Sequence, residues 1–446
     1  MTEDCKDSEK MTNNGRAGRG SRRLLLFGTI MGAILLSFVG LAWAQGDNQQ
    51  QNPPDKGAQP SSSSSVSPDT TSGYDDATGY RGSAKLKQPR DITAARKKAP
   101  NPALAQQATP TNRALGAYIQ DVWLDPPTKI DEFTHLTNTT QPEIPPHVVL
   151  YFQNWEQADK KYFDATKMDA VVDRGAMPMV TWASRDPTKG ANQKKYTDKN
   201  IINGQFDSYI KQWAQDAANW GESCKARKQL ATPCTMYLRF DHEMNGTWFP
   251  WSPGVNNNTT ADWINMWKHV HDVFQQEQAT VFKNNNESVT TNVRWVWSPN
   301  VDCGGCTSLA KVYPGDAYVD WAALDGYNWG SPWYTVAQIF ASSYDKITTQ
   351  IAPSKPFMIA EIASAEDGQD PLRKAKWIED AYSTDNVAHP GSIPNRMPLT
   401  QAVVWFSADK TAQGERDWRV NSSANSLQAY QAVVGNQIWQ GSLPSQ

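Results

Sequence analysis

Residues 235–251 of the chain read Thr-Met-Tyr-Leu-Arg-Phe-Asp-His-Glu-Met-Asn-Gly-Thr-Trp-Phe-Pro-Trp. A short apolar run ends here at two acids that flank His242, and a glycine and two tryptophans follow. A run of this length and composition is typical of a buried β-strand. The stretch therefore predicts a strand whose end presents carboxylates beside a flat aromatic surface.

Similar short β-rich runs recur along the chain and alternate with helical patterns, which is the signal for βα units around a parallel sheet. The expected strands are Leu115–Ile119, Val148–Phe152, Met177–Trp182, Thr235–Phe240, Val293–Trp297, Leu324–Tyr327, Phe357–Ala360 and Ala402–Phe406. Helical patterns between them include Phe206–Asn219, Asp262–Gln276, Val336–Thr348 and Pro371–Tyr382. Because a barrel of this class needs eight strands, we predict a (β/α)8 TIM barrel over residues 113–440.

Tryptophan is unusually frequent, with 19 in the chain. Trp263 and Trp267 recur at helical spacing with Val270 and Phe274, so we expect them to pack against the barrel. Other tryptophans lie in expected loops, where they either line a groove or simply pack: Trp251, Trp333 and Trp418.

The segment before the barrel indicates export. Residues 1–23 are basic and are expected to stay in the cytoplasm, and residues 24–44 are uncharged and long enough to span a bilayer (~20 residues). Ala42-Trp43-Ala44 also fits a cleavage site, so a retained transmembrane anchor and a cleaved signal peptide both stay open. Residues 45–112 are rich in Gln, Ser and Pro, which predicts a disordered linker. The expected location is extracellular, either secreted or anchored to the membrane by one N-terminal helix.

Charge and cysteine usage agree with that location. The net charge of −3 gives no reason to expect nucleic acid as a partner. Four cysteines fall in the exported part, and their most economical pairing is Cys224 with Cys234 and Cys303 with Cys306. A single zinc site formed by all four is the competing interpretation.

In barrels of this class the active site lies at the carboxyl ends of the strands. Polar and aromatic residues that follow or end the expected strands are Asp241, His242, Glu243, Tyr327, Asn328, Trp329, Glu361 and Trp405. Glu243 and Glu361 come from the fourth and seventh strands, and we expect them to converge across the barrel mouth. Retaining glycoside hydrolysis uses such a pair at ~5–5.5 Å, with one carboxyl protonated and the other ionised. Trp248 is placed to give Glu243 an apolar setting, whereas Arg239 and Tyr327 are placed to donate hydrogen bonds to Glu361.

Simpler structural interpretations exist for these residues. A glutamate after a buried strand is often a salt-bridge partner, and Arg239 is also consistent with a core arginine that pairs with Asp241. His242-Glu243 resembles the start of a His-Glu-x-x-His zinc motif, but the fifth position is Gly246, so that interpretation fails.

From Leu115 to about Val434 the chain resembles the glycoside hydrolases of family 26, a retaining family of clan A with many β-mannanases. The resemblance is carried by Arg239, by His242-Glu243-Met244-Asn245-Gly246 with Trp248, by Asp325-Gly326-Tyr327-Asn328-Trp329-Gly330 and by Ile359-Ala360-Glu361. It implies that Glu243 is the acid/base, that Glu361 is the nucleophile and that Tyr327 donates to Glu361.

The resemblance also implies the substrate contacts. His242 takes the place of an asparagine found in most related clan members and would contact the sugar near the reacting ring. Trp405 would form the platform beneath that ring. Arg239, Trp248, Tyr327 and Trp329 complete the expected substrate-binding set.

The implied function is an exported retaining endo-glycosidase that needs no metal or organic cofactor and acts as a monomer on a β-linked polysaccharide. Endo-β-1,4-mannanase is the first expectation, and a mixed-linkage β-glucanase or a β-1,3-xylanase would use the same motifs. A transglycosylase and a non-catalytic carbohydrate-binding surface protein are also compatible with this sequence. The membrane is expected as a partner only through an uncleaved N-terminal segment.

Overall fold

The computed structural model describes residues 108–156 and 163–443. The predicted cytoplasmic region, the transmembrane or signal segment and nearly all of the predicted linker lie outside the described residues. Within the two described ranges, no helix combines the length and the apolar character that crossing a bilayer requires.

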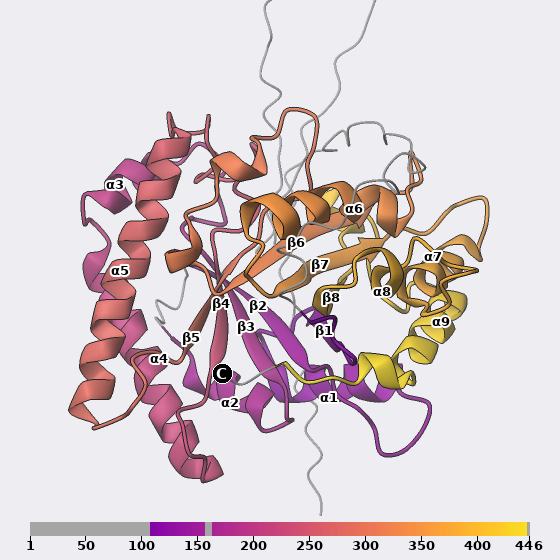
Figure 1. Ribbon diagram of the computed structural model, residues 1–446, viewed down its shortest axis with the longest axis horizontal. Helices are drawn as coiled ribbons and strands as arrows, with labels where there is room; N and C mark the ends of the chain where they lie inside the picture. Colours follow the sequence, from indigo (N-terminus) through magenta and orange to yellow (C-terminus); the bar gives the residue numbers. More distant parts are fainter. Residues whose placement is uncertain (1–107, 157–162, 444–446) are drawn as a thin grey trace, which may run out of the picture. The chain divides into compact units, whose positions relative to one another are not determined.

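Eight parallel strands follow one another in sequence order around a closed barrel, and β1 pairs with β8 to close it (Figure 1). The strands are β1 (Ala114–Ile119), β2 (Val148–Asn154), β3 (Met177–Ala183), β4 (Met236–Phe240), β5 (Val293–Trp297), β6 (Trp321–Asn328), β7 (Phe357–Ser364) and β8 (Thr400–Ser407). Each of the eight predicted strands is confirmed, and the predicted TIM barrel with them. The strands β6 and β7 extend further than predicted, so Asn328 and Glu361 lie within strands rather than after them.

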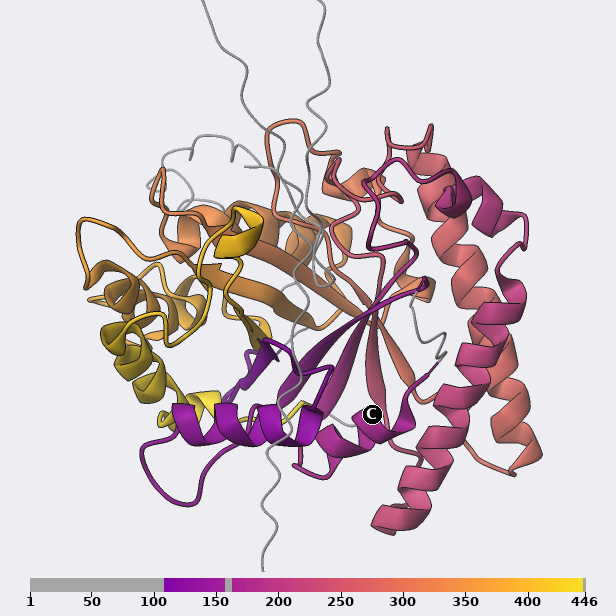
Figure 2. The same cartoon turned by 180° about the vertical axis from the view of Figure 1, so that it is seen from behind.

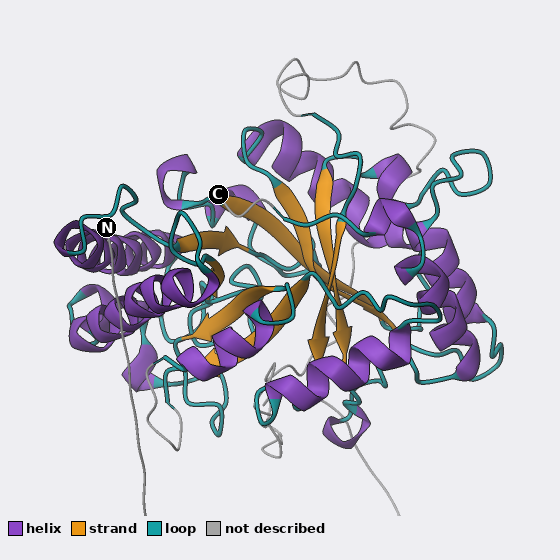
Figure 3. Cartoon of the chain, turned by 90° about the horizontal axis from the view of Figure 1, so that it is seen from below, coloured by secondary structure: helices purple, strands orange, loops and turns teal. Residues whose placement is uncertain are grey.

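Helices surround the strands on the outside of the barrel (Figures 2 and 3). They are α1 (Pro126–Thr137), α2 (Ala165–Val172), α3 (Asp198–Ile202), α4 (Asp207–Lys228), α5 (Thr260–Asn284), α6 (Val336–Lys346), α7 (Arg373–Tyr382), α8 (Ile393–Arg396) and α9 (Ala424–Val434). The four predicted helical patterns correspond to α4, α5, α6 and α7. Between β5 and β6 the connection contains two short 3-10 turns, Leu309–Lys311 and Asp316–Tyr318.

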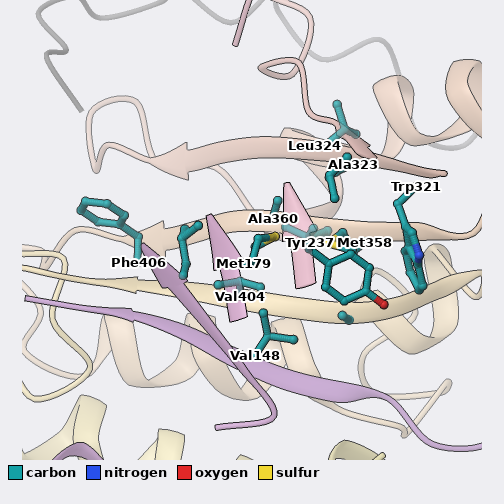
Figure 4. Packing of buried hydrophobic residues seen from close by; sticks show 14 of the residues in the cluster. Val148, Met179, Tyr237, Trp321, Ala323, Leu324, Met358, Ala360, Val404 and Phe406 are labelled. Atoms are coloured by element: carbon teal, nitrogen blue, oxygen red, sulfur yellow. The ribbon is translucent and has the colours of Figure 1, made fainter. Parts of the chain in front are cut away.

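The core has an inner and an outer part, because successive strand side chains point to opposite faces. Val148, Met179, Met358 and Val404 meet inside the barrel (Figure 4). Outside it, Trp267 of α5 packs on Phe240 and Trp295, with ring centroids 5.7 and 5.8 Å apart. Trp263 is buried beside it, which confirms the prediction that these two helical tryptophans belong to the core.

Both predicted cysteine pairs are present as disulfides. Cys224 with Cys234 links the last part of α4 to the segment that leads into β4, and Cys303 with Cys306 closes a short turn after β5. The first bond therefore restrains the segment that leads into β4, and the second restrains the turn after β5.

Candidate active site

The acidic motif at the end of β4 has an unusual backbone. Asp241 and Glu243 have φ angles of 41° and 52°, in the left-handed region that non-glycine residues rarely adopt. The Asp241 carboxylate accepts hydrogen bonds from the Ser184 backbone N–H (2.7 Å) and hydroxyl (2.6 Å), and the Glu243 N–H donates to the Ser298 carbonyl (2.8 Å). Backbone strain of this kind persists only where neighbouring structure fixes it, and it is concentrated at functional sites. Contacts from the ends of β3 and β5 thus hold the turn that carries Glu243.

Glu361 accepts hydrogen bonds on both carboxylate oxygens. Arg239 donates to Oε1 from Nη2, and the Tyr327 hydroxyl donates to Oε2. Glu361 is opposite Asp325 in the β6–β7 register, at a point where the register between β7 and β8 shifts. A register shift of this kind changes the direction of a side chain, and here it directs the side chain of Glu361 into the barrel mouth. The predicted donors to Glu361, Arg239 and Tyr327, are therefore confirmed.

Arg239 is fully buried and uses its remaining N–H groups to hold its position. Nε donates to Thr181 Oγ1 (2.7 Å), and Nη1 lies 2.9 Å from both carboxylate oxygens of Asp325. The Asp241 carboxylate accepts its hydrogen bonds from Ser184 and not from Arg239, so the interpretation of an Arg239–Asp241 core pair is wrong. The anchoring at Asp325 orients the guanidinium so that Nη2 faces the nucleophile candidate.

Asp325 is a site residue that the sequence interpretation missed. It is fully buried, and it accepts a further hydrogen bond from Ser298 Oγ (2.9 Å). Burial raises its pKa well above the ordinary value, while the Arg239 guanidinium opposes that rise. The signal that could have found it was an acid two positions before Tyr327 in an otherwise apolar strand, since residues two apart share one strand face.

Glu243 lies in a different environment. Its Oε2 accepts one hydrogen bond, from Trp248 Nε1 at 2.7 Å. Burial first, and the negative charge of Glu361 second, raise the pKa of Glu243 to about 8. A buried carboxyl with one neutral donor thus favours the protonated form, whereas Glu361 accepts hydrogen bonds from a guanidinium and a hydroxyl group.

Gly246 makes the contact between Trp248 and Glu243 sterically feasible. A Cβ built on this glycine would lie 2.4 Å from the Trp248 ring, well inside contact distance. The absence of a side chain at this position lets the indole fold back over the turn. The glycine between Glu243 and Trp248 is therefore required sterically, because a larger residue there would block the contact between them.

His242 packs between aromatic rings behind the turn. Its ring centroid is 4.7 Å from that of Phe249 and 5.7 Å from that of Phe152. Burial, followed by the charges of Arg239 and Arg185, lowers the pKa of His242 well below its ordinary value. The imidazole is thus neutral, and its buried Nδ1 has no hydrogen-bond partner among the described residues.

Trp405 lies away from the site, which corrects the prediction of a sugar platform there. It is fully buried on the outer face of β8, packs on Trp377 and Tyr430, and donates from Nε1 to the Trp418 carbonyl (2.8 Å). The next residue, Phe406, takes the inward direction and stacks on Tyr118 at 4.6 Å. Successive side chains of a strand point to opposite faces. A prediction that is wrong by one position therefore places a side chain inside the barrel when it lies in the outer core, against the helices.

The remaining aromatic residues have three different environments. Trp329 is half-buried, and its ring lies 6.3 Å from Tyr327 and 4.9 Å from Trp418. Trp251 is buried beneath the turn and donates to the His242 carbonyl (2.9 Å). Trp333 lies under the guanidinium of Arg373 at 4.4 Å. Of the predicted contacts, the structure thus brings Arg239, His242, Trp248, Tyr327 and Trp329 to the two glutamates or their immediate neighbours.

No grouping of three or more His, Cys, Asp or Glu side chains suited to a metal ion occurs in residues 108–156 and 163–443. The donors around Glu243 and Glu361 are arginine, tyrosine and tryptophan, which are not metal ligands in this arrangement.

The chain is similar to several known proteins. The chain is 35% identical to Endoglucanase H of Acetivibrio thermocellus over 276 residues, which are 60% of this chain and 25% of that protein. It is also 35% identical to Mannan endo-1,4-beta-mannosidase A and B of Caldalkalibacillus mannanilyticus over 149 residues, 32% of this chain and 25% of that protein. The chain thus spans about a quarter of the length of these two curated relatives.

Among solved structures, GH26A of a Muricauda species aligns with a TM-score of 0.48 at 17% identity, over 75% of this chain and 92% of that one. Residues 174–382 match the model of glycosyl hydrolase family 26, and this segment includes both Glu243 and Glu361. Over residues 174–382 the barrel is therefore similar to glycosyl hydrolase family 26.

Proposed function

We propose that the protein is a retaining endo-glycosidase in which Glu361 is the nucleophile and Glu243 the general acid/base. The observation that carries this proposal is the unequal environment of two buried glutamates. Glu361 receives hydrogen bonds from Arg239 and Tyr327, while Glu243 receives one from Trp248 and has a raised pKa. Two carboxyl groups whose surroundings separate their protonation states are what acid/base and nucleophilic roles require.

In the first step a Glu361 oxygen attacks the anomeric carbon and forms an ester bond to the sugar. The glycosidic C–O bond breaks, its electrons pass to the leaving oxygen, and Glu243 gives that oxygen its proton. Arg239 and Tyr327 fix the direction of the Glu361 carboxylate, so the attacking oxygen is oriented before the substrate arrives.

In the second step Glu243 starts as a carboxylate and takes a proton from water. The water oxygen attacks the anomeric carbon, the ester bond breaks, and Glu361 leaves as a carboxylate. Trp248 Nε1 donates to Glu243 and favours its charged form during this half of the cycle. Two displacements at one carbon retain its configuration.

β-1,4-Mannan is the first substrate proposed, because two of the curated relatives carry the name mannan endo-1,4-beta-mannosidase. A β-glucan is the second candidate, and a specific observation favours it. The match to the protein named Endoglucanase H covers 60% of this chain, against 32% for the Caldalkalibacillus mannosidase. The catalytic residues do not distinguish the two polymers, since both contain β-linked hexopyranoses.

The location and assembly are proposed from the sequence. Residues 16–44 combine arginines with an uncharged run, which supports export and either cleavage or anchoring in the membrane. A polymer outside the cell would be the partner, and the barrel would act as a monomer.

The experiment that tests the proposed function is release of reducing ends by the full chain from galactomannan, glucomannan, mixed-linkage β-glucan and β-1,3-xylan. Glu361→Gln and Glu243→Gln keep the side-chain shape and remove the carboxylate, and we expect each to lower turnover by several orders of magnitude. Glu379→Gln, at an exposed position of α7, is the matched control and should keep wild-type activity. Oligosaccharide binding without turnover by the wild-type chain would instead indicate a carbohydrate-binding protein.

A further inference from the structure

The loop after β8 carries a third carboxylate toward the catalytic pair. Residues 408–418 form a hairpin in which Asp409 and Asp417 make an antiparallel bridge. The Lys410 N–H donates to the Arg416 carbonyl (3.0 Å), and the Glu415 N–H donates to the Lys410 carbonyl (3.1 Å). These bonds fix Glu415 beside the turn of the hairpin.

Aromatic contacts connect this hairpin to the nucleophile candidate. Trp418 donates from Nε1 to Glu415 Oε2 (3.2 Å), and its ring lies 5.0 Å from that of Tyr327. Tyr327 in turn donates to Glu361. Arg416 Nε donates to the Trp329 carbonyl (3.2 Å), so the hairpin is also tied to the segment after β6. Glu415 therefore has a defined position next to the reacting groups.

Electrostatic interactions also connect the three carboxylates. The charge of Glu415 contributes to the raised pKa of Glu243. Burial raises the pKa of Glu415 itself, Glu361 adds to that rise, and Lys410 and the Trp418 N–H oppose it. Glu243 also interacts electrostatically with Glu361, which raises its pKa, with Arg239, which lowers it, and with the buried Asp325 and Tyr327 of β6.

Glu415 also retains capacity to bind a ligand. Trp418 occupies Oε2, and Oε1 accepts no hydrogen bond from the residues that the structure describes. Both Glu415 and Trp329 are half-buried, so each keeps part of its surface accessible. A pyranose presents both hydroxyl groups and C–H groups. A carboxylate can accept hydrogen bonds from the hydroxyls, and an adjacent aromatic ring can pack on the C–H groups, so the two together suit a pyranose.

We propose that Glu415 and Trp329 form a specificity wall, in which Glu415 binds a hydroxyl of the sugar next to the catalytic pair and discriminates between backbone sugars. The inference rests on the proposed glycosidase function. Glucose and mannose units differ only in the direction of the C2 hydroxyl, and an acceptor held in one place favours one direction. A site built to hydrogen-bond a hydroxyl discriminates strongly against a sugar that cannot supply it.

The test compares the full chain with Glu415→Gln, using manno- and cello-oligosaccharides and the pH dependence of kcat/KM. We expect kcat/KM on the preferred sugar to fall about tenfold, in line with loss of a hydrogen bond to a charged group, and the ratio between the two sugars to change. The alkaline limb of the profile should move to lower pH, because the charge that helped to raise the pKa of Glu243 is gone. A purely structural role would leave that limb in place.

Asp409→Asn is the matched control on the same hairpin. It removes one carboxylate that caps Thr411 and pairs with Arg419, and it should change neither the sugar ratio nor the alkaline limb. A Glu415→Gln enzyme with the wild-type ratio and the wild-type alkaline limb would overturn the proposal.

A binding measurement separates this proposal from the proposed function. If the wild-type chain hydrolyses no β-glycan, the proposed function is wrong. The specificity wall can still be tested by calorimetry, which compares oligosaccharide binding to Glu361→Gln with binding to the Glu361→Gln/Glu415→Gln double variant. Weaker oligosaccharide binding in the double variant supports the wall. Equal binding, or no binding to either protein, overturns it.

Discussion

Glu243 and Glu361 carry the same functional group, and their neighbours make them chemically different. The pKa of Glu243 is raised to about 8 mainly by burial, while Trp248 acts in the opposite direction by donating to the charged form. As the pH passes upward through that pKa, Glu243 loses the proton that it must give to the leaving oxygen. Activity should therefore decline on the alkaline side.

Replacement of Trp248 by phenylalanine removes this donor and keeps an aromatic ring. The charged form of Glu243 is then less favoured, so its pKa rises and the alkaline limb of kcat/KM should move to higher pH. This shift is opposite in sign to the one expected for Glu415→Gln. A limb that moves to lower pH in Trp248→Phe would contradict the role assigned to the indole.

Gly246→Ala tests the same contact through sterics alone. The added methyl group would meet the Trp248 ring at 2.4 Å, so the indole must move away from Glu243. We expect lower activity together with an alkaline limb shifted in the direction expected for Trp248→Phe. Gly368→Ala, where a Cβ would meet nothing within 4 Å, is the control and should behave as wild type.

The sequence predicted which residues take part in the site better than it predicted the direction of each side chain. Arg239 and Tyr327 were recognised as donors to Glu361, because strand ends of a parallel barrel converge at one mouth. Trp405 was assigned to the wrong face of its strand, and Asp325 was missed. Strands buried on both faces lack a polar–apolar alternation, so a sequence pattern does not show which residues point inward.

At the scale of elements, the predicted runs located every strand and differed from the structure mainly at their ends. The strands β6 and β7 continue through Asn328 and Ser364, whose side chains hydrogen-bond to each other (2.9 Å), and such polar residues interrupt an apolar pattern. Helix α5 begins at Thr260, where Thr259 and Asp262 form a capping box. Helix α4 runs on to Lys228 through a polar end that has no apolar periodicity.

The Cys224–Cys234 disulfide joins α4 to the segment that leads into β4 across a sequence separation of 10. A closed loop of this size is expected to contribute about 3 kcal/mol to the free energy of unfolding by limiting the unfolded chain. Thermal unfolding of the Cys224→Ser/Cys234→Ser double variant should therefore occur at a lower temperature than in the wild type.

The Cys303→Ser/Cys306→Ser double variant is the comparison for that measurement. Its closed loop is shorter, with a separation of 3, and the expected loss is smaller. An unchanged melting temperature in the Cys224/Cys234 variant would show that this bond adds nothing to stability.

At the scale of the whole molecule, closure of the barrel brings together residues that are far apart in the chain. Thr181, Arg239, Ser298, Asp325 and Glu361 come from β3 to β7 and their ends, yet they form one continuous hydrogen-bond network. The alternation of strands and helices predicted this architecture from the sequence. Distances and pairings within the network depend on barrel closure and on the bulge in β7, which local patterns do not encode.

The roles of Glu361 and Glu243 can be assigned by rescue of their alanine variants with azide, using an activated β-glycoside of the preferred sugar. Azide would replace the missing nucleophile in Glu361→Ala and give the α-glycosyl azide. In Glu243→Ala it would attack the glycosyl-enzyme instead and give the β-glycosyl azide. We expect these two products, one from each variant. A β-azide from Glu361→Ala, or full activity of that variant without azide, would contradict the assignment of Glu361 as the nucleophile.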